Sequence, residues 1–86
     1  MENQKDDKLV EVFINGKSYS VDKNDDISYE KIVTLAFGEC KNDPNVIYTI
    51  LYYKGNSDKP KGELLKGETV KIKKGMIFNV TRTDRS

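Results

Sequence analysis

Few residues of this 86-residue chain could carry out chemistry on a substrate. The chain has no histidine, and Cys40 is its only cysteine. Hydrolysis by a serine or cysteine nucleophile needs an imidazole base, and a zinc site needs several Cys or His ligands. Fourteen acidic residues leave a catalytic carboxylate pair open, but so short a chain has little room for a substrate pocket beside its core. We therefore predict that the protein is not an enzyme and binds no metal or cofactor.

Cys40 itself is predicted to be structural. A nucleophilic thiol needs a nearby cation or base that lowers its pKa, and the local sequence offers only Lys41. An unpaired cysteine more often behaves as a small hydrophobic residue. A single cysteine also excludes an internal disulfide, which fits a reducing compartment.

Length and composition indicate one globular domain outside the membrane. Eighty-six residues suffice for one hydrophobic core, and 36% hydrophobic with 34% charged residues is the balance of a folded domain. Residues 1–7 are polar and are predicted to be a disordered extension, with the domain over 8–82. The start of the chain lacks the apolar stretch of a secretory signal, so we expect a cytoplasmic protein.

Charge is distributed unevenly along the chain. Residues 1–53 carry 6 basic and 10 acidic side chains, whereas residues 54–86 carry 9 basic and 4 acidic ones. The favoured interpretation is that lysines protect strand edges from pairing with other chains, and the alternative is attraction of an acidic partner. A nucleic-acid ligand is not expected, because no Trp and no stripe of aromatic and basic residues accompanies these charges.

The first element predicted is a β-hairpin over residues 8–22. Val10, Val12 and Ile14 alternate with Glu11, Phe13 and Asn15, which is the period of a half-buried strand. The alternation resumes after the dipeptide Asn15-Gly16. That dipeptide favours a type I′ turn, whose two central residues have positive φ.

A polar loop is predicted over residues 22–26 and a short amphipathic helix after it, between Ser28 and Gly38. The Ser28 hydroxyl can accept a backbone N–H as an N-cap, and Gly38 can adopt the left-handed conformation that ends a helix. Ile27 and Ile32 have the spacing of a hydrophobic staple across the start of the helix.

Strands are predicted for most of the remaining chain. Residues 46–53 are apolar or aromatic except at Thr49, which indicates a central strand whose tyrosines pack within the sheet rather than stack on bases. A turn-forming loop leads to a short strand at 63–65, and a turn segment follows, in which Val70 and Ile72 alternate with lysines. The last strand is predicted to span about 76–82.

The order of these elements predicts an α+β protein of β-grasp, or ubiquitin-like, fold. One short helix across a mixed sheet of four to five strands, with the first and last strands adjacent, buries the apolar faces in two layers. Such domains serve as modifiers, sulfur carriers, adaptor modules and electron carriers, so the fold alone does not give the function. The electron carriers need Cys ligands and are excluded.

Three stretches resemble the bacterial multiubiquitin domain: Val12–Lys17 (VFINGK), Ile27–Ala36 (ISYEKIVTLA) and Gly67–Thr81 (GETVKIKKGMIFNVT). The resemblance covers nearly all of the chain from residue 9. It implies a ubiquitin-like protein encoded beside homologues of ubiquitin-activating enzymes, conjugating enzymes and deconjugating peptidases, in gene sets that resemble antiphage defence systems.

The resemblance further implies that other enzymes act on the C-terminal end of the chain. The terminal carboxylate would be activated with ATP by a separate enzyme, passed to a carrier residue, and joined to an amine or hydroxyl of a target protein. The protein itself would be a monomer when free. Residues 83–86 are predicted to be a flexible tail, and the segment that the enzymes would take up consists of Arg82, Thr83, Asp84, Arg85 and Ser86.

This end departs from ubiquitin and from the sulfur carriers, which finish in a Gly-Gly pair that threads a narrow channel. Here the chain reads Asp84-Arg85-Ser86. Either the partner enzymes accept a bulkier end, or processing trims it, or the chain is part of a longer one. Two alternatives to a modifier therefore stay open: a non-covalent ubiquitin-like binding module and, less favoured by this ending, a sulfur carrier.

Overall fold

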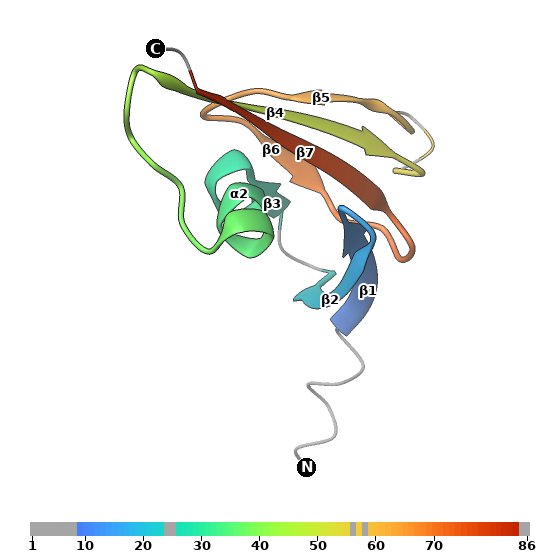
Figure 1. Cartoon of the computed structure of the whole chain (residues 1–86). Helices are drawn as coiled ribbons and strands as arrows, with labels where there is room; N and C mark the ends of the chain where they lie inside the picture. The colour runs from blue at the N-terminus through green and yellow to red at the C-terminus, as the bar shows by residue number, and fades with distance from the viewer. Residues whose placement is uncertain (1–8, 24–25, 56, 58, 85–86) are drawn as a thin grey trace.

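A hairpin, one helix and a set of later strands follow one another along the chain in the computed structural model (Figure 1), which describes residues 9–84 except 24, 25, 56 and 58. The elements are β1 (Leu9–Ile14), β2 (Lys17–Asp22), β3 (Asp26–Ser28), α2 (Tyr29–Phe37), β4 (Val46–Tyr53), β5 (Gly62–Leu64), β6 (Thr69–Lys71) and β7 (Ile77–Asp84).

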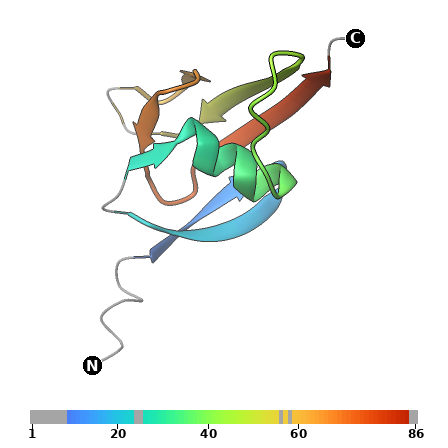
Figure 2. The same ribbon diagram turned by 90° about the vertical axis from the view of Figure 1, so that its left-hand side faces the viewer.

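Five of the strands form one mixed sheet in the order β2-β1-β7-β4-β5. The first and last strands, β1 and β7, are parallel neighbours, and the other pairs in this sheet are antiparallel. The helix lies across one face of the sheet (Figure 2). This arrangement confirms the predicted α+β, ubiquitin-like β-grasp fold.

The hairpin turn forms as its sequence predicts. Asn15 and Gly16 both have positive φ, 53° and 85°, as the two central residues of a type I′ turn require. The pairing runs from Leu9 opposite Asp22 to Ile14 opposite Lys17. Lys17 therefore lies at one end of an edge strand of the sheet.

The helix begins and ends at the two residues predicted to cap it. The Ser28 hydroxyl accepts the N–H of Lys31 at 3.1 Å, which satisfies one of the backbone donors left free at a helix start. Gly38 has a φ of 86°, and its N–H donates to the Thr34 carbonyl at 2.7 Å. These two caps limit α2 to nine residues.

Two strands of the structure were absent from the prediction. β3 and β6 pair antiparallel as a separate two-stranded sheet, with Ile27 opposite Val70. Asp26 was assigned to a polar loop, and this was wrong. A three-residue strand is too short to show alternation in the sequence, so this pairing depends on contact with a segment more than forty residues away.

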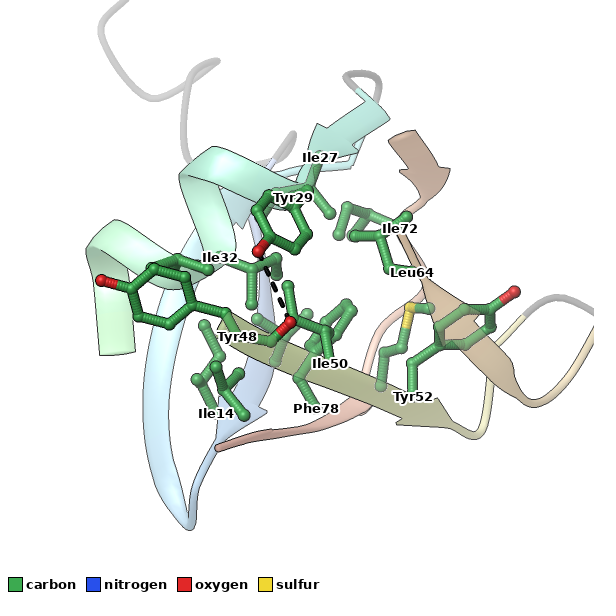
Figure 3. Packing of buried hydrophobic residues seen from close by; sticks show 14 residues of the cluster. Ile14, Ile27, Tyr29, Ile32, Tyr48, Ile50, Tyr52, Leu64, Ile72 and Phe78 are labelled. Atoms are coloured by element: carbon green, nitrogen blue, oxygen red, sulfur yellow. Dashed lines mark hydrogen bonds between the residues drawn. The ribbon is translucent and has the colours of Figure 1, made fainter. Parts of the chain in front are cut away.

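The core fills the space between the helix and the sheet (Figure 3). The fully buried side chains come from four elements and from the turn before β7: Val12, Ile14, Ile32, Val33, Ile50, Met76 and Phe78. Tyr29 and Tyr48 meet edge to face, with ring centroids 6.4 Å apart, and the Tyr29 hydroxyl donates to the Tyr48 carbonyl at 3.4 Å. The tyrosines of β4 at 48 and 52 are thus packing residues, as predicted, whereas Tyr53, for which the sequence predicts the same role, is 37% exposed.

Candidate functional site

The last strand, β7, lies in the middle of the sheet and leads to the end of the chain that the sequence marks as functional. Its first half is buried between β1 and β4, with Phe78 and Val80 in the core. Its second half, from Thr81 to Asp84, is exposed at every residue. The strand therefore carries the chain from the core to the surface (Figure 1).

The side chain of Asn15 fixes the point at which β7 separates from β1. Along the parallel ladder, the N–H groups of Phe13 and Asn15 donate to the carbonyls of Met76 and Phe78, each at 2.9 Å. The Asn15 side chain then supplies the next step. Its Oδ1 accepts the N–H of Val80 at 2.8 Å, and its Nδ2 donates to the Val80 carbonyl at 3.1 Å. A side-chain amide thus takes the place of a backbone amide where β1 turns away.

β7 continues two residues beyond its predicted end at 82. Thr83 pairs with Ile47 and Asp84 with Val46, at the start of β4. Thr83 and Asp84, which the sequence assigns to a flexible tail, are therefore strand residues with exposed side chains. The alternation of apolar residues that marks a strand stops at Val80. No signal in the sequence therefore showed that β7 would stay paired with the long strand β4 beyond this residue. Arg85 and Ser86 lie outside the described residues.

Arg82 and Asp84 form an ion pair along one face of this exposed segment. Arg82 Nε donates to Asp84 Oδ1 at 2.9 Å, and Nη2 donates to Oδ2 at 3.4 Å. Residues two apart on a strand share a face, which brings the two side chains together. This hydrogen bond to Asp84 is the main reason why the pKa of Arg82 is raised above its usual range. The pair reinforces an extended backbone at the end of the strand.

A second feature of the sheet was missed from the sequence: its outer face, away from the helix, is partly apolar along β4. Ile47, Leu51 and Tyr53 alternate with buried residues and are 41%, 37% and 37% exposed. We call these three residues the outer β4 face. Since the described residues supply one helix, which covers one side of the sheet, half of the side chains of an apolar strand inside that sheet must point outward. Counting the available layers could have found this face.

Cys40 follows the helix and is half-buried, packed against the core. Burial raises the pKa of its thiol, and the carboxylate of Glu30 raises it further, while Lys66 acts in the opposite direction. The thiol is therefore held protonated, which makes it a weak nucleophile and agrees with the structural role predicted for it.

Neither a metal site nor a membrane helix is found in the described part of the chain. Within residues 9–84, less the four positions noted above, no group of three or more Cys, Asp or Glu side chains could hold a metal ion. Over the same residues, no helix is long and apolar enough to cross a membrane. Among the described residues, the surface end of β7 and the outer β4 face are features with functional potential.

Comparison with known proteins gives one match. The model of a protein family described as multiubiquitin matches residues 10–84, which is most of the chain and agrees with the resemblance found in the sequence. No curated protein matches the chain, and no solved structure does.

Proposed function

The chain belongs to the multiubiquitin family, and on that premise we propose that it is a ubiquitin-like protein modifier, joined to targets through its C-terminal carboxylate. The observation that carries this proposal is the course of β7, which leaves the core at Val80 and presents Thr81 to Asp84 at the surface in extended form. An extended, exposed segment is what an enzyme channel needs in order to admit the end of a chain.

The chemistry would be supplied by separate enzymes. A carboxylate oxygen attacks the α-phosphorus of ATP and releases pyrophosphate, which leaves an acyl-adenylate. A carrier nucleophile then displaces AMP, and an amine or hydroxyl of the target displaces the carrier. The modifier contributes only the carboxylate and the surface by which it is held, which accounts for a chain with no histidine and a protonated cysteine.

The partners of this pathway follow from the family resemblance. They are an activating-like enzyme, a conjugating-like enzyme, a deconjugating peptidase and the target proteins, in a bacterial system of the kind that acts against phage. We place the pathway in the cytoplasm, where ATP and a reducing environment support thiol carriers. We also propose that the protein is no enzyme itself, is a monomer when free, and binds neither nucleic acid nor membranes.

Co-expression with the neighbouring activating and conjugating proteins tests the proposal. We expect intact-mass analysis to show covalent adducts, and peptide mapping to show a branched peptide that ends in Ser86 or in a trimmed position of the same segment. Deletion of Thr83–Ser86 should abolish every adduct. Absence of any branched peptide from the full-length chain would contradict the modifier function, and a terminal thiocarboxylate in its place would indicate a sulfur carrier.

The outer β4 face favours a second candidate function, that of a non-covalent binding module. Apolar side chains such as Leu51 and Tyr53 at the surface are common at protein-binding sites. In a binding module, Leu51→Glu should abolish partner capture, whereas deletion of Thr83–Ser86 should leave it unchanged. Ser18→Glu is the matched control, because Ser18 is exposed on the distant edge strand β2 and lies opposite the uncharged Phe13.

A further inference from the structure

The two halves of β7 are held in different ways. From Ile77 to Val80 the strand is bonded on one edge by β1 or by the Asn15 side chain, and on the other edge by β4. From Thr81 to Asp84 the described residues that pair with it belong to β4 alone. We propose that β7 beyond Val80 is a detachable strand end, which peels away from β4 when a partner enzyme takes up the segment. This inference rests on the proposed modifier function.

Little would be lost when this segment detaches. Because the backbone groups of Phe78 and Val80 point to β1 and Asn15, the alternation of a strand directs those of Thr81 and Thr83 toward β4. Peeling therefore breaks backbone pairing at two residues, opposite Thr49 and Ile47. All four side chains of the segment are already exposed, so no apolar surface is uncovered on it.

The Arg82–Asp84 ion pair does not oppose detachment. Both partners lie within the segment, so the contact of Arg82 Nε with Asp84 Oδ1 can persist after the strand has left β4. It acts along the strand rather than across it. The segment can thus leave the sheet and still be extended.

Peeling has a natural limit at Val80. This residue is 4% exposed, lies in the core, and is bonded by Asn15 through both of its backbone groups. Its neighbour Phe78 is fully buried. Detachment past this point would open the core, so the released segment begins at Thr81.

Detachment lengthens the part of the strand that can enter an enzyme. The four residues from Thr81 to Asp84 span about 13 Å when extended. An acyl intermediate has to be shielded from water, which favours a site about as deep as one packed protein layer, about 10 Å. The released segment spans that depth, whereas the paired segment stays along β4.

A reversible lock tests the proposal directly. Val46 and Asp84 are opposite each other at a position without mutual backbone bonds, where paired residues are close enough for a disulfide. The variant is Val46→Cys with Asp84→Cys, in a Cys40→Ser background. The matched control is Glu11→Cys with Ser20→Cys in the same background, at an equivalent pair of β1 and β2.

The oxidised Val46→Cys, Asp84→Cys variant should form ATP-dependent adducts at least about tenfold more slowly, because its disulfide blocks a local opening that has to precede the reaction. Reductant should restore the rate. The control disulfide should change nothing. Equal rates for the oxidised and reduced lock would overturn the detachable strand end while leaving the modifier function intact. If the wild-type chain forms no adduct at all, the modifier function is contradicted. Whether the strand end detaches is then decided by amide hydrogen exchange on the free protein.

Amide hydrogen exchange on the free protein is that second measurement. The amides of Thr81 and Thr83 point to β4, as does that of Asn79, which lies opposite Leu51. We expect protection at Thr83 to be at least about tenfold lower than at Asn79, because local openings near a strand end cost less than openings of the core. Equal protection at Thr83 and Asn79 would show that the segment does not detach.

Discussion

Asn15 bonds both backbone groups of Val80 through its side-chain amide, at 2.8 and 3.1 Å, although 65 residues separate the two in the sequence. The contact joins the first strand to the last after their backbone ladder has ended. It lets β1 turn away at Gly16 without leaving the N–H and carbonyl of a core residue unpaired.

Removal of the Asn15 amide should therefore destabilise the protein. Asn15→Gly keeps the positive φ of the turn but leaves the two groups of Val80 without this partner, and we expect it to cost about 1–3 kcal/mol of unfolding free energy. Urea denaturation measures the loss. Asn15→Asp is the matched control, since its carboxylate can still accept the N–H of Val80 and should restore part of the stability. A cost for Asn15→Gly below about 0.3 kcal/mol would contradict this role.

The start of the helix offers a second test. Ser28→Ala removes the hydroxyl that accepts the N–H of Lys31, and loss of an N-cap costs about 1 kcal/mol. Ser28→Asp retains an acceptor and should stay close to the wild type. Thermal unfolding followed by circular dichroism would measure both, and similar losses for the two variants would indicate that the cap contributes nothing.

Close packing at Gly62 leads to a third prediction. A Cβ at this position would lie 2.8 Å from the hydroxyl oxygen of Tyr52, which is itself 2% exposed and cannot easily move. Gly62→Ala should thus destabilise the protein by about 1–3 kcal/mol, as overpacking generally does. In a double-mutant cycle, Tyr52→Phe should relieve part of that cost. Additive effects of the two substitutions would rule out this contact as the cause.

Cys40 should be slow to react and should couple folding to alkaline pH. Burial, then Glu30, raises the pKa of its thiol. Alkylation by iodoacetamide should be slower in the folded than in the urea-unfolded chain at the same pH, with its pH midpoint displaced upward.

The stability effect of the same thiol has a defined sign. A raised pKa in the folded state means that the contribution is full below the unfolded pKa and is lost as pH rises toward and through the folded one. The wild type should therefore lose stability relative to Cys40→Ser as the solution is made alkaline. Parallel stability curves for the two proteins across that range would contradict the assignment.

Much of the fold could be predicted because its signals are local. The Asn15-Gly16 turn, the Ser28 cap and the Gly38 stop each depend on residues within a few positions of one another, and all three form. The strand over 46–53 was also correct in its bounds, since β-branched and aromatic residues fill it.

What was missed depends on distant contacts. β3 exists because Ile27 lies opposite Val70, and β7 reaches Asp84 because β4 offers Val46 and Ile47 as partners. Neither pairing leaves a periodic trace in the sequence. The outer β4 face was missed for a related reason, since only the number of covering layers shows which side of an apolar strand stays exposed.

The parallel pairing of β1 with β7 has a practical consequence for handling the protein. Two parallel neighbours run in the same direction, so the chain enters the sheet at Leu9 and leaves it at Asp84 from opposite ends of the molecule (Figure 1). A fluorophore or an affinity tag attached upstream of Leu9 would stand well away from Asp84. Copies fused head to tail would be joined through opposite ends of neighbouring domains.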